Sequence, residues 1–201
     1  LIDDLITKGT DEPYRMFTSR AEYRILLRQD NADIRLTQKG YDLGLATEER
    51  LDRLNIKLKY IEKLKTFFAT TSAIPAEINP ILESLNSSAI PQKTKLTKIM
   101  SRPQVSFESL EKLESIQEFL AENGRDNESI EQAFIQIKYS GYIEREKDNA
   151  AKITRLENIK IPANFEYHKL ASLSNEAKQK LKEIQPNTIA HAGRISGVSP
   201  S

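Results

Sequence analysis

Apolar side chains recur every three or four positions along most of this chain, which is the spacing expected of amphipathic helices. The clearest stripe covers residues 48–68, and Thr47 stands just before it as a helix cap. A second long pattern opens at Asn127 and covers residues 128–159, with Gly141 inside it. Glycine weakens a helix interior by roughly 1 kcal/mol relative to alanine, so we expect a kink or close packing there. The first stripe consists of Leu51, Leu54, Leu58, Ile61, Leu64, Phe67 and Phe68.

Prolines and turn residues divide the rest of the chain into shorter segments. A cap at Thr18 or Ser19 predicts a helix that continues through Leu27. Ser106 is expected to start another amphipathic helix, and Ser174 to start the last clear one. Further short helices are expected at residues 34–40, 80–86 and 94–100.

These elements predict an all-α, bundle-like fold, because strands are too few and connections too short for alternating strands and helices. Residues 1–13 hold a short apolar segment and end at Pro13, and we interpret them as a linker. The helical patterns that follow divide into two candidate subdomains, residues 14–125 and residues 126–201.

The composition is typical of a soluble globular protein, since 38% of the 201 residues are hydrophobic and 29% are charged. No run approaches the ~20 apolar residues that span a bilayer, and residues 1–4 do not resemble the start of a signal peptide. The formal net charge is +1, so a surface for nucleic acid requires local segregation of charge. Because the chain starts without Met and stops at Pro200–Ser201, where another helix would begin, we expect a piece of a longer protein.

Patterns for catalysis and cofactor binding are absent from the sequence. The seven glycines are scattered, and none completes the strand, glycine-rich turn and helix start that hold a dinucleotide. The lack of cysteine excludes disulfides, thiolate metal sites and a cysteine nucleophile. His168 and His191 lie on separate segments without the spacing of metal ligands. We therefore expect no catalytic site, no metal and no bound cofactor within these residues.

A row of basic side chains lies near the start of the chain. Arg20, Arg24 and Arg28 are four positions apart, so a helix would place them along one face. Their planar guanidinium groups suit paired hydrogen bonds to phosphate, but the same groups could form internal ion pairs with nearby acids. The spacing alone leaves both interpretations open. The other basic residues of this region are Arg15, Arg35 and Lys39, and its acids are Glu22, Asp30 and Asp33.

Three separated stretches resemble a known family. Residues 12–45 read EPYRMFTSRAEYRILLRQDNADIRLTQKGYDLGL, residues 138–167 read KYSGYIEREKDNAAKITRLENIKIPANFEY, and residues 173–201 read LSNEAKQKLKEIQPNTIAHAGRISGVSPS. Their content and order are similar to the glucose-inhibited division protein A family, the flavoprotein subunit of the tRNA uridine 5-carboxymethylaminomethyl modification enzyme. Residues 68–127 carry no motif that adds to this resemblance.

The resemblance implies a longer parent enzyme that binds FAD in an N-terminal Rossmann-type domain and uses NADH and a methylene-tetrahydrofolate donor. Such a parent is expected to be a cytoplasmic homodimer, away from membranes, that works with a GTPase partner on C5 of the wobble uridine of tRNA. The flavin fingerprint and the catalytic cysteines of the family belong to a part that these residues do not include. By this resemblance, residues 1–13 link to the FAD domain, and the rest is a non-catalytic region for tRNA binding and partner docking.

The resemblance also assigns residues to these roles. The basic block that matches the family, extended to Lys39, supplies candidates for contact with the tRNA backbone: Arg15, Arg20, Arg24, Arg28, Arg35 and Lys39. The later blocks supply candidates for the partner-facing surface: Gly141, Tyr142, Arg145, Arg194 and Gly197. Turn chemistry offers another explanation for residues 193–200, a tight turn between two helices. For the whole chain the alternative function is a purely structural helical scaffold for protein–protein assembly.

Overall fold

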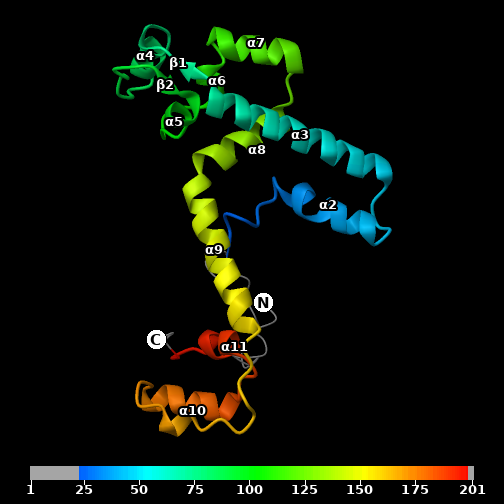
Figure 1. The fold of residues 1–201 in the computed structure, drawn as a ribbon, viewed down its shortest axis with the longest axis vertical. Coiled ribbons are helices and arrows are strands. Elements are labelled where there is room, and N and C mark those ends of the chain that lie inside the picture. The colour runs from blue at the N-terminus through cyan, green and yellow to red at the C-terminus, as the bar shows by residue number, and fades with distance from the viewer. Residues whose placement is uncertain (1–22, 199–201) are drawn as a thin grey trace, which may run out of the picture. The chain divides into compact units, whose positions relative to one another are not determined.

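The computed structural model of this protein describes residues 23–198, and their fold is helical, as the sequence predicted (Figure 1). The chain divides into two compact units, one formed by Ile25–Glu144 and one that includes Arg145 and the residues after it. The strands in the described part are two-residue segments, β1 (Ser72–Ala73) and β2 (Thr94–Lys95), which pair antiparallel with Ser72 opposite Lys95.

The first unit contains the longest helix and a series of shorter ones. Their bounds are α2 (Ala32–Asp42), α3 (Glu48–Thr70), α4 (Pro75–Ser84), α5 (Leu96–Met100), α6 (Phe107–Leu110), α7 (Glu114–Asn123) and α8 (Asn127–Lys138). Helix α9 (Ser140–Glu157) begins in this unit, and the division between the units falls within it.

Helix α3 forms where the apolar stripe predicted it. The hydroxyl of Thr47 accepts a hydrogen bond from the Arg50 amide. The negative charges of Glu48 and Glu49 in the first turn interact favourably with the positive end of the helix dipole. The chain leaves the helix at Thr71, which has an extended backbone. The stripe faces the interior, with these four members buried: Leu54, Ile61, Leu64 and Phe68.

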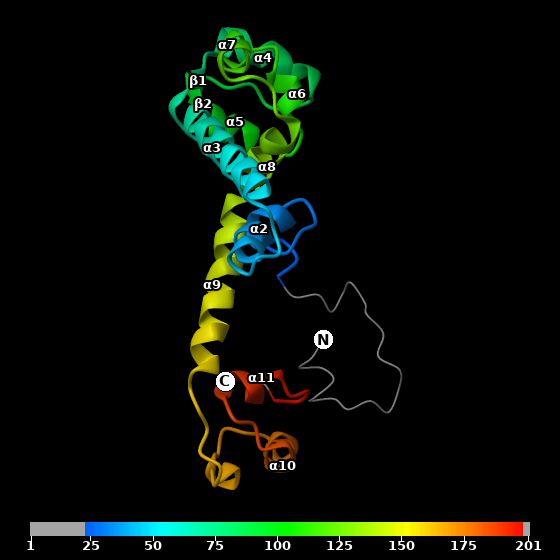
Figure 2. The same ribbon diagram turned by 90° about the vertical axis from the view of Figure 1, so that its right-hand side faces the viewer.

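The core of the first unit lies where α3 packs against α8 and α5, and the two views of the ribbon show these helices side by side (Figures 1 and 2). Aromatic side chains extend this core toward α7, since the rings of Phe67 and Phe119 are 4.7 Å apart. Phe68 is fully buried and packs on Phe107. Truncating a buried aromatic ring of this kind typically costs 3–5 kcal/mol, so this cluster is a main source of stability.

The long helical pattern after Asn127 is two helices rather than one. Helix α8 ends at Tyr139, whose backbone has φ −106° and ψ 16°, and α9 starts at the next residue. The expected irregularity is therefore real but lies two positions before Gly141. A Cβ at Gly141 would meet no atom within 4 Å, so close packing does not explain this glycine.

The sequence predicted a helix from Thr18 or Ser19 through Leu27, and the structure describes residues 23–27 of that stretch. These residues are not helical. Residues 23–27 form turns, and Tyr23 has a positive φ of 55°, which an α-helix does not allow. Within residues 23–198 the first helix begins at Ala32. The side chain of Asn31 stabilises the non-helical path, because its amide donates to the Leu26 carbonyl and its oxygen accepts from the Arg28 amide. Arg24 and Arg28 consequently do not stack on one helical face.

The second unit is built from short elements around a small core. These elements are η2 (Tyr167–Lys169), α10 (Asn175–Ile184) and α11 (Ile189–Arg194). Ser174 caps α10 as predicted, by accepting a hydrogen bond from the Ala177 amide. The buried apolar side chains are Ala177, Leu181, Ala190 and Ile195.

The units meet in sequence at Glu144, later than the expected boundary between residues 125 and 126. The reason is tertiary packing, because α8 contributes Ile130 and Ala133 to the core of the first unit. A subdomain that began at residue 126 would separate α8 from α3, its main packing partner.

Candidate nucleic-acid interface

Arg28, a candidate phosphate contact, is tied into the interior of the first unit. Its Nε donates to the Asp30 carboxylate at 3.1 Å, and its Nη2 donates to Oε1 of Gln132 at 3.4 Å. Its Nη1 also donates to the carbonyl of Ile25. With 20% of its side chain exposed, Arg28 fixes the turn before α2 and joins that turn to α8.

The partner of this arginine, Asp30, forms the centre of a small polar network. The Gln132 amide donates to the Asp30 carbonyl at 3.0 Å and also to the Asp30 carboxylate. Burial alone would raise the pKa of Asp30, but the hydrogen bond from Gln132 and the charge of Arg28 together lower it. The carboxylate is therefore held ionised, and its network links residues about one hundred positions apart.

Arg35 is also engaged locally. Its Nε donates to the Asn31 side chain at 2.9 Å, and its Nη2 donates to the Arg28 carbonyl at 3.3 Å. Arg28 therefore has an internal acidic partner of the kind that the structural interpretation predicted, whereas Arg35 is held by a neutral side-chain oxygen and a backbone carbonyl. Asp33, expected to pair with an arginine, is instead bound by Lys57.

Lys57 holds α2 against the main helices of the unit. Its ammonium lies 2.7 Å from the Asp33 carboxylate of α2 and 3.3 Å from the Glu128 carboxylate of α8. Burial would lower the pKa of Lys57, but the two carboxylates raise it, Asp33 more strongly. The ammonium is a structural cation and is not presented to a ligand.

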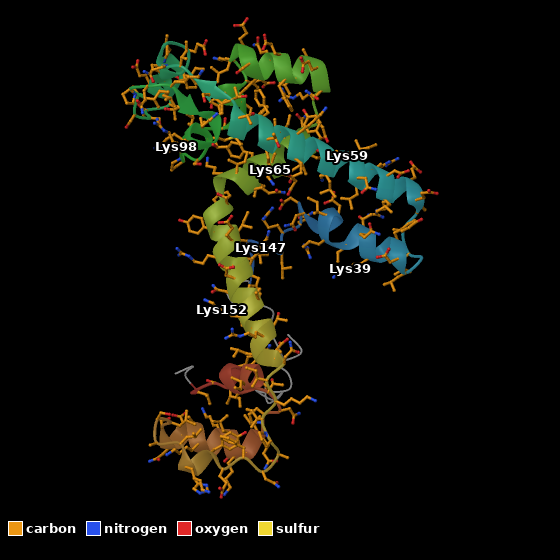
Figure 3. The ribbon with its side chains drawn as sticks, viewed as in Figure 1. Lys39, Lys59, Lys65, Lys98, Lys147 and Lys152 are labelled. Atoms are coloured by element: carbon orange, nitrogen blue, oxygen red, sulfur yellow. The ribbon has the colours of Figure 1, made fainter. Side chains whose placement is uncertain are left out.

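Of the four remaining basic candidates, the structure describes Arg24 and Lys39. Arg24 and Lys39 are exposed, and Lys39 lies in the last turn of α2 (Figure 3). Arg15 and Arg20 lie outside the described residues, so the predicted row of three arginines can be followed only from Arg24 onward.

Three of the partner-facing candidates lie on α9 and point to solvent. Gly141, Tyr142 and Arg145 are all exposed, and Tyr142 keeps 65% of its accessible surface. No residue of α9 is fully buried. An exposed tyrosine next to an arginine is the kind of surface that protein interfaces favour.

The other two candidates, Arg194 and Gly197, have internal contacts in the second unit. Arg194 forms an ion pair with Glu157. Gly197 has φ +91°, a backbone conformation that favours glycine, and a Cβ there would lie 2.9 Å from Oε1 of the Glu176 side chain. The Ser196 carbonyl next to it accepts a hydrogen bond from Lys180 at 2.8 Å. These contacts fit the alternative prediction of a tight turn at this position.

A basic segment that the resemblance did not single out lies between α4 and α6. Residues 84–107 contain no Asp or Glu, although the whole chain is nearly neutral. Its four basic residues are Lys93, Lys95, Lys98 and Arg102. A count of charges along the sequence would have found this segment, but not which of its side chains are available to a ligand.

The structure separates these four cations. Lys95 donates to the Thr70 carbonyl at 2.5 Å, and Arg102 donates to the Ser87 hydroxyl at 3.1 Å, so both stabilise the fold. Lys93 and Lys98 are exposed, as is Lys95, and no salt bridge within residues 23–198 involves Lys93 or Lys98. Lys98 lines a groove of about 470 Å³ between α3, α5 and α8, and Lys65 of α3 lines it too (Figure 3).

The described residues do not fit a dinucleotide or a metal. Within residues 23–198 no strand is followed by a glycine-rich turn and a helix start, which FAD or NADH would require. The same residues hold no group of three or more His, Cys, Asp or Glu that could bind a metal ion. None of the helices described is long and apolar enough to cross a membrane.

Two family models match adjoining parts of this chain. Residues 48–147 match the C-terminal helical domain of the tRNA modifying enzyme MnmG/GidA, and residues 149–201 match its C-terminal helical bundle. Together they cover most of the sequence, and they meet close to the division between the structural units.

The chain belongs to the MnmG/GidA family.

Curated MnmG/GidA members share about half of their aligned residues with this chain. The tRNA uridine 5-carboxymethylaminomethyl modification enzyme MnmG of Christiangramia forsetii is 55% identical over 205 residues, which cover 100% of this chain and 32% of that protein. The enzyme of the same name from Flavobacterium johnsoniae is 58% identical over 181 residues, 90% of this chain and 29% of that protein. The chain thus spans about a third of the length of these MnmG relatives.

Solved MnmG/GidA structures have the same fold over nearly all of the chain. Aquifex aeolicus GidA in its form II crystal aligns with a TM-score of 0.66 and 36% identity, covering 99% of this chain and 30% of that one. The form I crystal aligns with a TM-score of 0.63 and 35% identity, covering 29% of that chain. The family inferred from short motifs is therefore confirmed, including for the stretch 68–127 that carried no motif.

Proposed function

We propose that this chain is the tRNA-binding and partner-docking region of an enzyme that adds a carboxymethylaminomethyl group to C5 of the wobble uridine of tRNA. The observation that carries the proposal is family membership over the full chain, together with relatives whose names state this modification. The parent would use FAD and NADH, act as a cytoplasmic homodimer and work with a GTPase partner. The chemistry would take place in the remaining two thirds of the parent.

The exposed cations Arg24 and Lys39 are the best-supported tRNA contacts among the described candidates, since Arg28 and Arg35 are engaged internally. Arginine and lysine on the surface neutralise phosphates and release counterions, which positions an RNA without reading its bases. Arg15 and Arg20 remain part of the proposal as sequence candidates. Tyr142 and Arg145, exposed on α9, are the corresponding candidates for partner docking.

The test is the salt dependence of tRNA binding by this chain, measured by fluorescence anisotropy with a labelled tRNA. Replacement of Arg24 or Lys39 by alanine should weaken binding of different tRNAs equally and lower the salt slope by somewhat under one unit each. Arg24→Lys should restore binding only in part, because lysine keeps the charge but loses the planar fork. Lys112→Ala is the matched control, since Lys112 is an exposed lysine between α6 and α7.

Unchanged affinity in the Arg24 and Lys39 variants would argue against this surface. A second candidate function, a structural scaffold for protein assembly, is favoured by the internal bonding of Arg28 and Arg35. That function predicts that neither Arg24→Ala nor Lys39→Ala alters tRNA affinity, whereas Arg28→Ala should lower the melting temperature under either function because its partners are internal. Binding isotherms on these variants separate the two functions, and thermal melts on the same samples measure the structural role of Arg28.

A further inference from the structure

We propose that the groove between α3, α5 and α8 binds the phosphate backbone of RNA, as a site separate from the arginine-rich segment before α2. The inference rests on the proposed function only in taking RNA as the ligand. Three helices of the first unit form the groove. Its lining residues are Lys65, Thr66 and Ala69 of α3, Thr97, Lys98 and the adjoining Ser101 of α5, Gln136 and Ile137 of α8, and Ser140.

The charge of this lining is entirely positive. Lys65 and Lys98 reach the groove from different helices, and none of the lining residues is an acid. Lys98 belongs to the segment 84–107, which contains no Asp or Glu. No salt bridge within residues 23–198 involves Lys98.

Lys65 does have an acidic neighbour, Glu62, at 2.7 Å. Glu62 is on the adjacent turn of α3, and its side chain is 66% exposed. Exposed pairs of this kind contribute little, because water and salt screen them. A phosphate can therefore take the place of Glu62 as the partner of Lys65 at small cost.

The lining also carries uncharged groups that can donate hydrogen bonds to phosphate. Thr66, Thr97 and Ser140 bring hydroxyls, and Gln136 brings an amide, all of which can donate to phosphate oxygens. The lining has no aromatic side chain on which a base or another planar ring could stack. Ser101 donates its own hydrogen bond to the Thr97 carbonyl at 2.7 Å, and we assign it no contact with RNA.

A second hollow on the unit provides an internal comparison. It lies between α3 and α7 and also has two lysines, Lys59 and Lys63, but Glu62 and Glu122 line it as well. Lys63 is moreover bound to the Asn123 side chain at 2.7 Å. The mixed charge of this hollow does not favour a polyanion, which makes Lys59 the natural control for Lys65 on the same helix (Figure 3).

The first experiment measures tRNA affinity of the 201-residue chain at 0.1 M salt for Lys65→Gln, Lys98→Gln and the control Lys59→Gln. Each groove variant should weaken binding about fivefold, the loss expected when one phosphate contact is removed at this salt concentration. The control should stay within about twofold. Equal effects at all three positions would show general electrostatic attraction and overturn the assignment.

The second experiment does not depend on the folding of a charge variant. Because the chain has no cysteine, Ala69→Cys places a single thiol in the groove, and Ala76→Cys places one on the exposed face of α4. A photo-crosslinker attached to each thiol should label tRNA from position 69 and not from position 76. Labelling from both or from neither would overturn the groove assignment.

Two further outcomes distinguish the sources of failure. Polyglutamate of matched charge, used as a competitor, should displace tRNA poorly; equally strong displacement would indicate a site for an acidic protein segment. If Arg24 and Lys39 variants weaken binding but the groove variants and crosslinks do not, the groove proposal fails while the proposed function stands. If the chain binds no tRNA at all, both fail.

Discussion

The anchoring of the turn before α2 gives the sharpest prediction about stability. Gln132 is 2% exposed, and its amide donates both to the backbone carbonyl and to the carboxylate of Asp30. Gln132→Leu keeps a similar volume but removes both donors and the acceptor for Arg28. The change therefore removes the Gln132 donor from a part-buried carbonyl and from an ionised carboxylate.

The expected loss follows from these two hydrogen bonds. A neutral hydrogen bond contributes about 1 kcal/mol net, and one to a charged group about 1.5–3 kcal/mol. Burial of the extra apolar surface of leucine raises the free energy of unfolding by on the order of 1 kcal/mol. The free energy of unfolding of the first unit should thus fall by about 1.5–3 kcal/mol, which corresponds to a decrease in Tm of roughly 10 °C for a unit of this size.

Urea denaturation followed by circular dichroism measures this loss, with Gln117→Leu on the exposed face of α7 as the matched control. The control should change the unfolding free energy by less than about 0.5 kcal/mol. The deficit of Gln132→Leu should also shrink as the pH falls from about 4 through the lowered folded pKa of Asp30, because the ionised carboxylate that Gln132 stabilises is lost over that range. A deficit under 0.5 kcal/mol at pH 7, or one that does not change with pH, would refute the role assigned to this network.

Two further predictions concern the glycines and acid stability. Gly197→Ala should destabilise the second unit by about 1–2 kcal/mol because of its positive φ and the close Glu176 oxygen, whereas Gly141→Ala should stabilise α9 by up to about 1 kcal/mol; thermal melts of the two variants check this. The pKa of Asp30 is lowered in the folded state, so its ionised form contributes stability above about pH 4 that is lost as the pH falls through the folded pKa. Unfolding free energies from pH 5 to pH 3 should therefore fall more steeply for the natural chain than for Asp30→Asn, and parallel curves would contradict the shift.

Capping residues and apolar spacing predicted the helices that depend on neighbouring residues in the sequence. Thr47 and Ser174 cap the helices that they were expected to cap, and the stripe of α3 is buried as its spacing indicated. The helix expected from Ser106 is divided into α6 and α7 at Leu113, although its apolar positions are buried as the pattern requires. Periodicity therefore found the buried face more reliably than the continuity of the helix.

The role of Arg28 could not be read from the sequence, because its partner Gln132 lies 104 positions away. Spacing of four among arginines suggested a helical face, but the Asn31 side chain stabilises turns there instead. The groove was missed for a related reason: Lys65 and Lys98 belong to segments that only the packing of α5 on α3 brings together. The sequence showed the acid-free segment 84–107. It did not show that Lys95 and Arg102 bond within the fold while Lys93 and Lys98 remain available.

The distance in sequence between Asp30 and Gln132 also has a consequence for synthesis of the protein. The two residues are separated by 102 positions, which a ribosome adds in about 5–20 s at typical elongation rates. During that interval the turn before α2 lacks its anchor on α8, and α2 lacks the Glu128 carboxylate that shares Lys57. The loop after α2 carries Leu43 and Leu45, which are 74% and 82% exposed even in the folded chain. The segment from this turn to the loop after α2 therefore remains without its anchor on α8 for seconds during synthesis, whereas the exposure of Leu43 and Leu45 does not change when α8 arrives.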